Sequence, residues 1–166
     1  MSTKAEIIQS KIFAPEDYLK FRKTLSYWQI KDKKLVFTNG CFDILHMGHI
    51  DYLSKAADFG HVLIVGLNTD ASVRKIKGAN RPVNDQNARA ALLASLFFVD
   101  AVVMFDQDTP YELIKEVQPD FLVKGSDYKE EEIVGYDIVR SKNGKVIAID
   151  LLEGYSTTSI IKKLII

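Results

Sequence analysis

Residues 35–50 read Leu-Val-Phe-Thr-Asn-Gly-Cys-Phe-Asp-Ile-Leu-His-Met-Gly-His-Ile, and they predict a buried strand that turns into a helix. The apolar run at 35–37 is of strand type, and the turn residues at 39–40 interrupt it. From position 47 onward, apolar side chains recur at helical spacing at Ile50, Leu53, Ala56 and Ala57. A strand, a glycine-bearing loop and a helix in this order predict one βα unit of a layered α/β fold.

His46, Gly48 and His49 lie at the predicted start of that helix. Two imidazoles three residues apart share one side of the first turn, where unpaired backbone N–H groups and the positive end of the helix dipole also lie. The glycine lets a bulky anion approach the backbone, and the histidines can donate hydrogen bonds to it or carry charge when a phosphate raises their proton affinity. We therefore interpret the stretch as a phosphate site. The chemistry it indicates is displacement at a nucleotide phosphorus, in which the protein positions groups and stabilises charge.

Two plainer interpretations of the histidine pair remain open. Histidines at this spacing are often ordinary surface or packing residues. A zinc pair is the other alternative, but structural zinc sites take four ligands, largely cysteine and histidine, and the chain has only His61 and Cys41 besides. The strand, glycine and helix around the pair favour the phosphate interpretation.

The rest of the chain alternates strands and helices. Short and nearly all apolar strands are predicted at 35–38, 62–66, 101–105, 121–123 and 146–149. Helices are predicted at 47–59, 86–98, 109–117, 131–141 and 157–164, and the third begins with a capping box at 109–112. This order predicts an α/β fold, a Rossmann-like doubly wound parallel sheet of about five strands with helices on both faces. Ligands then bind at the carboxyl ends of the strands.

Residues 1–33 are predicted to form an N-terminal helical extension, ahead of the main domain at 34–166. Tyr18, Phe21, Leu25 and Trp28 recur at helical spacing after a proline at position 15. We interpret this aromatic stripe as packing against the sheet. The alternative is a contact between two copies of the chain in a homodimer.

The charge balance excludes some classes of partner. The 22 basic and 22 acidic side chains cancel, so an anion site must be local, and we expect neither nucleic acid nor a membrane surface as partner. The single cysteine excludes an intrachain disulfide and fits a reducing compartment. The N-terminus has no apolar core of signal-peptide type, and no stretch has the roughly 20 apolar residues that cross a bilayer. We expect a soluble, cytoplasmic protein.

Polar residues and glycines follow the predicted strands at their carboxyl ends, at 39–43, 68–70, 124–128 and 153–159. In this fold such loops converge on one rim of the sheet. Ser156, Thr157 and Thr158 precede the last predicted helix, where a hydroxyl ordinarily caps the first turn. Three hydroxyls after Gly154 are more than capping requires, so we interpret them as a second helix N-terminus that faces phosphate oxygens.

Four further side chains are candidates, each with a plainer alternative. Lys77 lies in the polar segment 77–81, which could close over a triphosphate, or it is a solvated surface lysine. Arg89 lies on an amphipathic helix, where a surface ion pair worth under about 1 kcal/mol is the alternative. Asp43 could orient a group or hold Mg²⁺ through water, because magnesium keeps its waters and uses few carboxylates. Cys41 is better interpreted as a small packing residue than as a nucleophile.

Two segments together resemble the cytidylyltransferase-like nucleotidyltransferases. They are residues 39–49, Asn-Gly-Cys-Phe-Asp-Ile-Leu-His-Met-Gly-His, and residues 153–158, Glu-Gly-Tyr-Ser-Thr-Thr. The resemblance covers nearly everything from Lys34 onward, so it makes 34–166 a nucleotidyltransferase domain. Within that superfamily, residues 63–74, 80–84 and 123–128 look most like the adenylyltransferase domain of ADP-heptose synthesis.

The resemblance implies that an oxygen of D-glycero-β-D-manno-heptose 1-phosphate attacks the α-phosphate of ATP and that pyrophosphate leaves, with Mg²⁺ assisting. By matching positions, His46, His49, Lys77 and Arg89 would be catalytic, with Arg89 on the acceptor side. Mg²⁺ would be held by the triphosphate rather than by a direct side-chain motif. The residues expected to bind the nucleotide are Asn39, Gly40, Cys41, Phe42, Asp43, Gly48, Lys124, Gly125, Asp127, Gly154, Tyr155, Ser156, Thr157 and Thr158.

Several alternatives to this function remain. Leu151 and Leu152 stand where glycerol-phosphate cytidylyltransferases have an Arg-Thr pair. This difference weakens the interpretation of the chain as a CTP-dependent enzyme that acts on a polyol phosphate. Adenylyl transfer onto a cofactor precursor and a nucleotide-binding module without turnover are further candidates. A fragment of a class I aminoacyl-tRNA synthetase fits less well, because such enzymes are much longer. The partners implied are small-molecule substrates, together with a separate sugar kinase that supplies the 1-phosphate.

Overall fold

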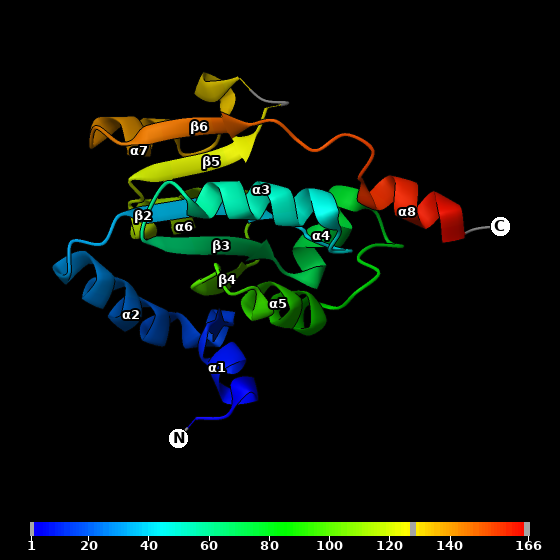
Figure 1. Cartoon of the computed structure of the whole chain (residues 1–166), viewed down its shortest axis with the longest axis horizontal. Helices are drawn as coiled ribbons and strands as arrows, with labels where there is room; N and C mark the ends of the chain where they lie inside the picture. Colours follow the sequence, from blue (N-terminus) through cyan, green and yellow to red (C-terminus); the bar gives the residue numbers. More distant parts are fainter. Residues whose placement is uncertain (1, 127–128, 165–166) are drawn as a thin grey trace.

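The computed structural model describes residues 2–126 and 129–164, and its centre is a six-stranded parallel sheet (Figure 1). The strand order is β1-β4-β3-β2-β5-β6, and every neighbouring pair is parallel. The predicted Rossmann-like fold is confirmed, although the predicted number of about five strands is one too few. The strands are β1 (Ile12–Phe13), β2 (Leu35–Gly40), β3 (Val62–Asn68), β4 (Ala101–Phe105), β5 (Phe121–Gly125) and β6 (Lys145–Ile149).

Helices cover both faces of the sheet (Figure 1). Those in the described residues are α1 (Lys4–Ser10), α2 (Tyr18–Ile30), α3 (Met47–Ala57), α4 (Asp70–Lys77), α5 (Gln86–Ser95), α6 (Tyr111–Val117), α7 (Tyr136–Ser141) and α8 (Thr157–Leu164), with 3₁₀ turns at Pro15–Asp17 and Glu130–Glu132. None of the helices described is long and apolar enough to cross a membrane.

The core is divided by the sheet into two clusters. On one face, Leu53 of α3 and Leu93 of α5 pack with Leu63 and Val65 of β3. On the other face, α2, α6 and α7 pack against residues that include Ile64 of the same strand. Side chains of a strand alternate between the two faces, and a strand covered on both faces is apolar throughout. All seven residues of β3 are accordingly buried.

The predicted N-terminal helical extension also contributes a strand to the sheet. Between α1 and α2, β1 pairs in parallel with β4, and Ile12 stands opposite Val102. Phe21 and Leu25 of α2 are buried in the core, and Trp28 packs against it partly buried. The interpretation of the aromatic stripe as packing against the sheet is therefore confirmed for Phe21, Leu25 and Trp28, whereas Tyr18 is exposed.

Three helical predictions need correction. No helix was predicted at 70–77, but this segment forms α4, which Thr69 caps by accepting a hydrogen bond from the Ser72 N–H. The capping box at 109–112 is wrong, because α6 begins at Tyr111 with Pro110 at the N-cap and no side-chain cap. The helix predicted at 131–141 is split into a 3₁₀ turn and α7, because Gly135 between them has a φ of +91°.

The strand order places the ligand site. β2 lies between β3 and β5, and the chain passes from β2 to β3 through α3 on one face. It reaches β5 through α6, which covers the other face. In parallel sheets the crevice between two strands with oppositely placed crossovers is the preferred site for ligands. The site is therefore expected at the carboxyl ends of β2 and β5.

Candidate active site

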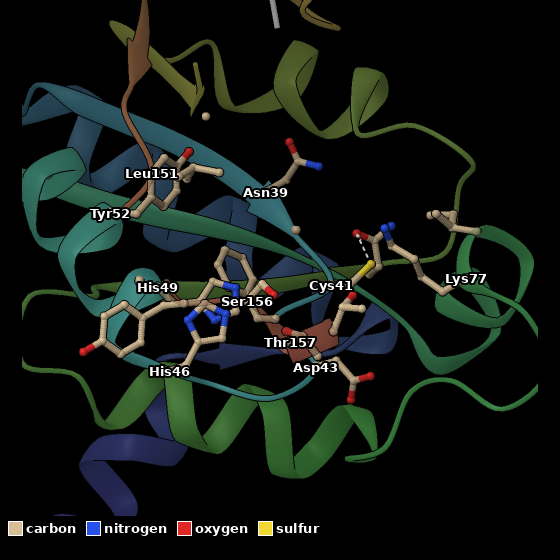
Figure 2. A pocket seen from close by; sticks show the side chains of 18 of the residues that line it. Asn39, Cys41, Asp43, His46, His49, Tyr52, Lys77, Leu151, Ser156 and Thr157 are labelled. Carbon is tan, nitrogen blue, oxygen red and sulfur yellow. Dashed lines mark hydrogen bonds between the residues drawn. The ribbon is translucent and has the colours of Figure 1, made fainter. Parts of the chain in front are cut away.

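A cavity of about 510 Å³ opens at the carboxyl ends of β2, β3 and β5, beside the first turns of α3 and α8 (Figure 2). Its volume lies in the range of small-molecule sites. Among the described residues, the lining consists of Asn39, Gly40, Cys41, Phe42, Asp43, His46, Gly48, His49, Tyr52, Asn68, Ile76, Lys77, Arg81, Lys124, Gly125, Leu151, Leu152, Tyr155, Ser156, Thr157 and Thr158.

Most of the site residues nominated from the sequence meet in this cavity. Three of the four catalytic candidates, His46, His49 and Lys77, line it, together with most of the nucleotide-binding candidates. Gly154 is outside the described lining but forms the turn before it with a φ of +82°. Asp127 lies outside the described residues. Arg89, the fourth catalytic candidate, is absent from the described lining.

Tyr52, Ile76 and Arg81 line the cavity although the sequence analysis did not nominate them. Tyr52 belongs to the apolar face of α3, and its hydroxyl lies 2.7 Å from Thr38 Oγ1 and donates to the carbonyl of Val123 at 3.0 Å. No sequence signal separates such a residue from ordinary core. The signal for Arg81 was its place in the polar segment 77–81.

The two histidines form a stacked pair at the start of α3. His46 is the N-cap residue with an extended backbone, and His49 lies in the first turn. Their ring centroids are 3.8 Å apart with an angle of 19° between the planes. The Nδ1 atoms of both rings are buried without a hydrogen-bond partner in the described residues. Two buried and unpartnered ring nitrogens at a helix N-terminus are suited to receive a polar ligand.

Burial keeps both imidazoles neutral in the free protein. It lowers the pKa of His49 to about 4, and the neighbouring His46 adds to this effect while the Ile44 carbonyl opposes it. Burial also lowers the pKa of His46. A phosphate placed against the pair would oppose both effects, because an anion favours the protonated ring.

Gly48 brings the starts of α3 and α8 together. A Cβ atom at this position would lie 3.2 Å from the His46 ring and 3.2 Å from Tyr155 Cβ. These distances are shorter than ordinary carbon contacts, so an alanine would push the imidazole or the segment before α8 aside. The glycine therefore allows the imidazole to stack and the two helix N-termini to border one cavity.

The hydroxyl cluster forms the N-terminus of α8. Ser156 Oγ accepts a hydrogen bond from the Ser159 N–H at 3.0 Å, which is the usual capping contact. Thr157 and Thr158 begin the helix, and all three hydroxyl residues line the cavity. Figure 2 labels Ser156 and Thr157 among them. The capping interpretation therefore holds for Ser156, and the cap does not involve the hydroxyls of Thr157 and Thr158.

Phe42 fixes the loop that leads into the histidine pair. Its φ of +43° is in the left-handed region, which few residues other than glycine adopt. The ring meets His49 edge-on with centroids 5.1 Å apart, and a Cβ at Gly40 would lie 3.0 Å from it. Packing against the glycine and the imidazole thus holds an unfavourable backbone conformation in place.

Asp43 anchors the segment at 81–84 to the loop after β2. Its side chain is 1% exposed, and one carboxylate oxygen accepts a hydrogen bond from Arg81 Nε at 2.5 Å. The other oxygen accepts from the backbone N–H groups of Val83 at 2.7 Å and Asn84 at 3.1 Å. The carboxylate is therefore engaged in holding two loops together, which does not favour the expected role in holding Mg²⁺ through water.

Arg89 is buried instead of exposed, so the alternative interpretation of a surface ion pair is wrong. Its side chain is fully covered, and Nη2 lies 2.8 Å from Asp70 Oδ1. The other two donor groups bind backbone carbonyls, Nη1 that of Cys41 at 2.6 Å and Nε that of Asn84 at 3.1 Å. All three nitrogens of the guanidinium thus hold α4, α5 and the two loops at the cavity in place.

Cys41 and Lys124 complete the rim. Burial raises the pKa of the Cys41 thiol, which lies 4.0 Å from Asn68 Oδ1 along the dashed line in Figure 2. This supports the packing interpretation over a nucleophile. Lys124 Nζ donates to the Asn39 carbonyl at 3.2 Å, while Asn39 Oδ1 is buried without a partner in the described part of the chain.

No group of three or more histidine, cysteine or carboxylate side chains in the described residues could hold a metal ion.

The fold, the paired imidazoles and the two helix N-termini at one cavity define a nucleotidyltransferase. The chain belongs to the cytidylyltransferase-like family, whose sequence profile matches residues 37–163. In particular, it is similar to proteins named bifunctional protein HldE. It is 56% identical to that of Campylobacter jejuni subsp. doylei over 94% of this chain and 32% of the relative. It is 59% identical to that of Nitratiruptor sp. over 81% of this chain and 28% of the relative. The chain thus spans about one third of the length of these relatives.

Solved structures support the fold. The chain is similar to the lipopolysaccharide core biosynthesis protein from Thermoplasma volcanium GSS1, with a TM-score of 0.62 and 30% identity over 73% of this chain and 99% of that one. It also matches a pantoate-beta-alanine ligase from Francisella tularensis, with a TM-score of 0.56 over 90% of this chain and 76% of that one. Because the second match is only 18% identical, it shows a shared fold alone.

Proposed function

We propose that this chain transfers AMP from ATP to D-glycero-β-D-manno-heptose 1-phosphate, giving ADP-heptose and pyrophosphate. The observation that carries the proposal is that two helix N-termini border one cavity, one with the stacked imidazoles of His46 and His49 and the other with the hydroxyls at 156–158. Helix N-termini bind phosphate through backbone N–H groups and the helix dipole. The choice of ATP and of a sugar phosphate follows from the resemblance of residues 63–74, 80–84 and 123–128 to the adenylyltransferase domain of ADP-heptose synthesis. The similarity to proteins named bifunctional protein HldE and to a lipopolysaccharide core biosynthesis protein supports this choice.

In the proposed reaction, an oxygen of the acceptor phosphate attacks the α-phosphorus of ATP. A new phosphorus–oxygen bond forms, the bond to the oxygen bridging the α- and β-phosphates breaks, and that oxygen leaves with pyrophosphate. His46 and His49 donate hydrogen bonds to the phosphate oxygens as charge develops in the transition state. One donor of this kind contributes roughly 3 kcal/mol.

The leaving pyrophosphate needs its own contacts. Ser156, Thr157 and Thr158 at the start of α8 would bind the β- and γ-phosphates, and Lys77 at the end of α4 would add a positive charge. Mg²⁺ enters with the triphosphate as part of the substrate. The nucleoside is proposed to lie between the loop after β2 and Lys124 and Gly125 at the end of β5.

Arg89 would act in this mechanism as a positioning residue. It holds the Cys41 carbonyl and Asp70, and it does not belong to the described lining of the cavity. The acceptor must be supplied by phosphorylation of a sugar at its first carbon, so a sugar kinase acts before this enzyme. The single cysteine and the phosphorylated substrates support a cytoplasmic location.

The experiment that tests the proposal is pyrophosphate release with ATP or CTP against heptose 1-phosphate, glycerol 3-phosphate and flavin mononucleotide. We expect turnover with ATP and heptose 1-phosphate. The variant His49→Ala is the control that links turnover to this cavity. Turnover with only CTP and glycerol 3-phosphate would instead establish the polyol-phosphate alternative, and no turnover with any pair would favour a binding module.

A further inference from the structure

The cavity contains an arginine that the proposed mechanism has not yet used. Arg81 lines the cavity, and its side chain is 21% exposed. The family resemblance implied an acceptor-side role for Arg89, but all three of its guanidinium nitrogens bind protein groups. Arg81 is the arginine in the described lining.

The contacts of Arg81 leave one edge of its guanidinium for a ligand. Only Nε is bound to Asp43, and among the described residues Nη1 and Nη2 have no hydrogen-bond partner. Asp43 is itself fixed by two backbone N–H groups, so the carboxylate restrains the guanidinium that it binds. A restrained guanidinium with two parallel N–H donors is suited to binding two oxygens of one phosphate.

The positive charge of the described cavity lining is suited to binding two anions. The described lining carries the cations Lys77, Arg81 and Lys124 and the single carboxylate Asp43. Lys77 and Arg81 follow β3 in the chain and Lys124 belongs to β5, and these two strands lie on opposite sides of β2. A triphosphate between the helix N-termini already has two imidazoles, hydroxyls and Lys77 beside it. A reaction between two phosphorylated substrates needs a separate cationic contact, because the second anion must approach the negative charge of the triphosphate.

We propose that Arg81, held by Asp43, binds the phosphate of the acceptor through Nη1 and Nη2. This assignment rests on the proposed function and adds to it the residue that recognises the phosphomonoester of the second substrate. The guanidinium orients the phosphate so that its remaining oxygen faces the α-phosphorus. Acceptors without a phosphate lack the group that Arg81 recognises.

The test compares Arg81→Gln and Arg81→Lys with the wild-type protein. We expect the KM for heptose 1-phosphate to rise about 30-fold in Arg81→Gln and about tenfold in Arg81→Lys, since a charge-assisted pair of hydrogen bonds is lost or reduced to a point charge. The Kd of a non-hydrolysable ATP analogue, measured by calorimetry, should change less than about threefold. Lys75→Gln is the matched control, because Lys75 is an exposed cation of α4 outside the described lining.

Three outcomes would overturn the assignment. They are an unchanged acceptor KM in Arg81→Gln, an equal rise in the acceptor KM and in the Kd of the ATP analogue, and a Lys75→Gln variant that loses acceptor affinity as strongly. Binding of inorganic phosphate in the presence of the ATP analogue gives a readout without turnover. If the wild-type protein turns over none of the substrates tested, the proposed function fails, while weaker phosphate binding by Arg81→Gln still supports the contact and unchanged binding refutes it.

Discussion

The imidazoles of His46 and His49 are stacked in the lining of the cavity with ring centroids 3.8 Å apart, so a proton on one ring disfavours a proton on the other. In the free protein both rings have a lowered pKa. The rings therefore act first as neutral hydrogen-bond donors. A triphosphate at the same place supplies the negative charge that makes protonation favourable.

This pair predicts an acid-sensitive free protein. The pKa of His49 is about 4 in the folded state and near 6.5 in the unfolded chain, so the unfolded chain binds more protons between these values. The free energy of unfolding should fall as the pH is lowered from about 6.5 to about 4, by roughly 2 kcal/mol after solvent screening. Urea unfolding at several pH values measures this change in the free energy of unfolding. A His49→Gln variant should show a flatter profile, and equal profiles would contradict the assignment.

The His49→Ala variant separates catalysis from folding. We expect kcat to fall roughly 10²-fold or more, because the variant loses a donor that acts in the transition state. Circular dichroism and thermal unfolding should show an intact fold. His61→Ala is the matched control, since His61 precedes β3 and accepts a hydrogen bond from the Lys34 N–H outside the cavity. A folded His49→Ala protein with full activity would refute the proposed role.

The contact between Asp43 and Arg81 predicts a coupled loss of stability. In Asp43→Asn the buried charge is removed and the guanidinium loses its partner, so the free energy of unfolding should decrease by roughly 3 kcal/mol. Combined with Arg81→Gln, the double variant should lose less than the sum of the single effects, by about 1–3 kcal/mol. Denaturant unfolding of the four proteins gives this coupling energy. Strictly additive effects would mean that the contact does not hold the loops together.

Gly48→Ala should reduce activity more than stability. The added Cβ would lie 3.2 Å from the His46 ring and 3.2 Å from Tyr155 Cβ, which displaces the imidazole or the start of α8. Alanine gains up to about 1 kcal/mol in helix propensity, and this gain offsets part of the steric cost. We expect kcat to fall about tenfold while the free energy of unfolding changes by less than about 1 kcal/mol. Lys55→Ala, on the exposed side of the same helix, should leave kcat unchanged.

The features that the sequence predicted well are local. The change from an apolar run to helical spacing at 35–57 predicted β2, α3 and the position of the histidines, because such periodicity reflects burial directly. The hydroxyls at 156–158 predicted the start of α8, because hydroxyl side chains favour the N-terminus of a helix. Since the loops of a parallel sheet converge at one edge, the cavity then followed from the topology.

The features that could not be predicted from the sequence depend on residues that lie far away along the chain. β1 has two residues, too few to show any periodicity, and it exists as a strand because β4 pairs with it. Arg89 has the sequence appearance of a surface residue, and its burial depends on Cys41, Asp70 and Asn84. The anchoring role of Asp43 likewise required its contact with Arg81, 38 residues away.

The pairing of β1 with β4 also determines how the molecule can be shortened. A version that starts at residue 34 would leave the backbone N–H and C=O groups of β4 unpaired along one side of the sheet. An open apolar strand of this kind is a template for addition of another chain. The two residues at 12–13 thus act as a cover against self-association, and a soluble truncated protein has to begin before Ile12.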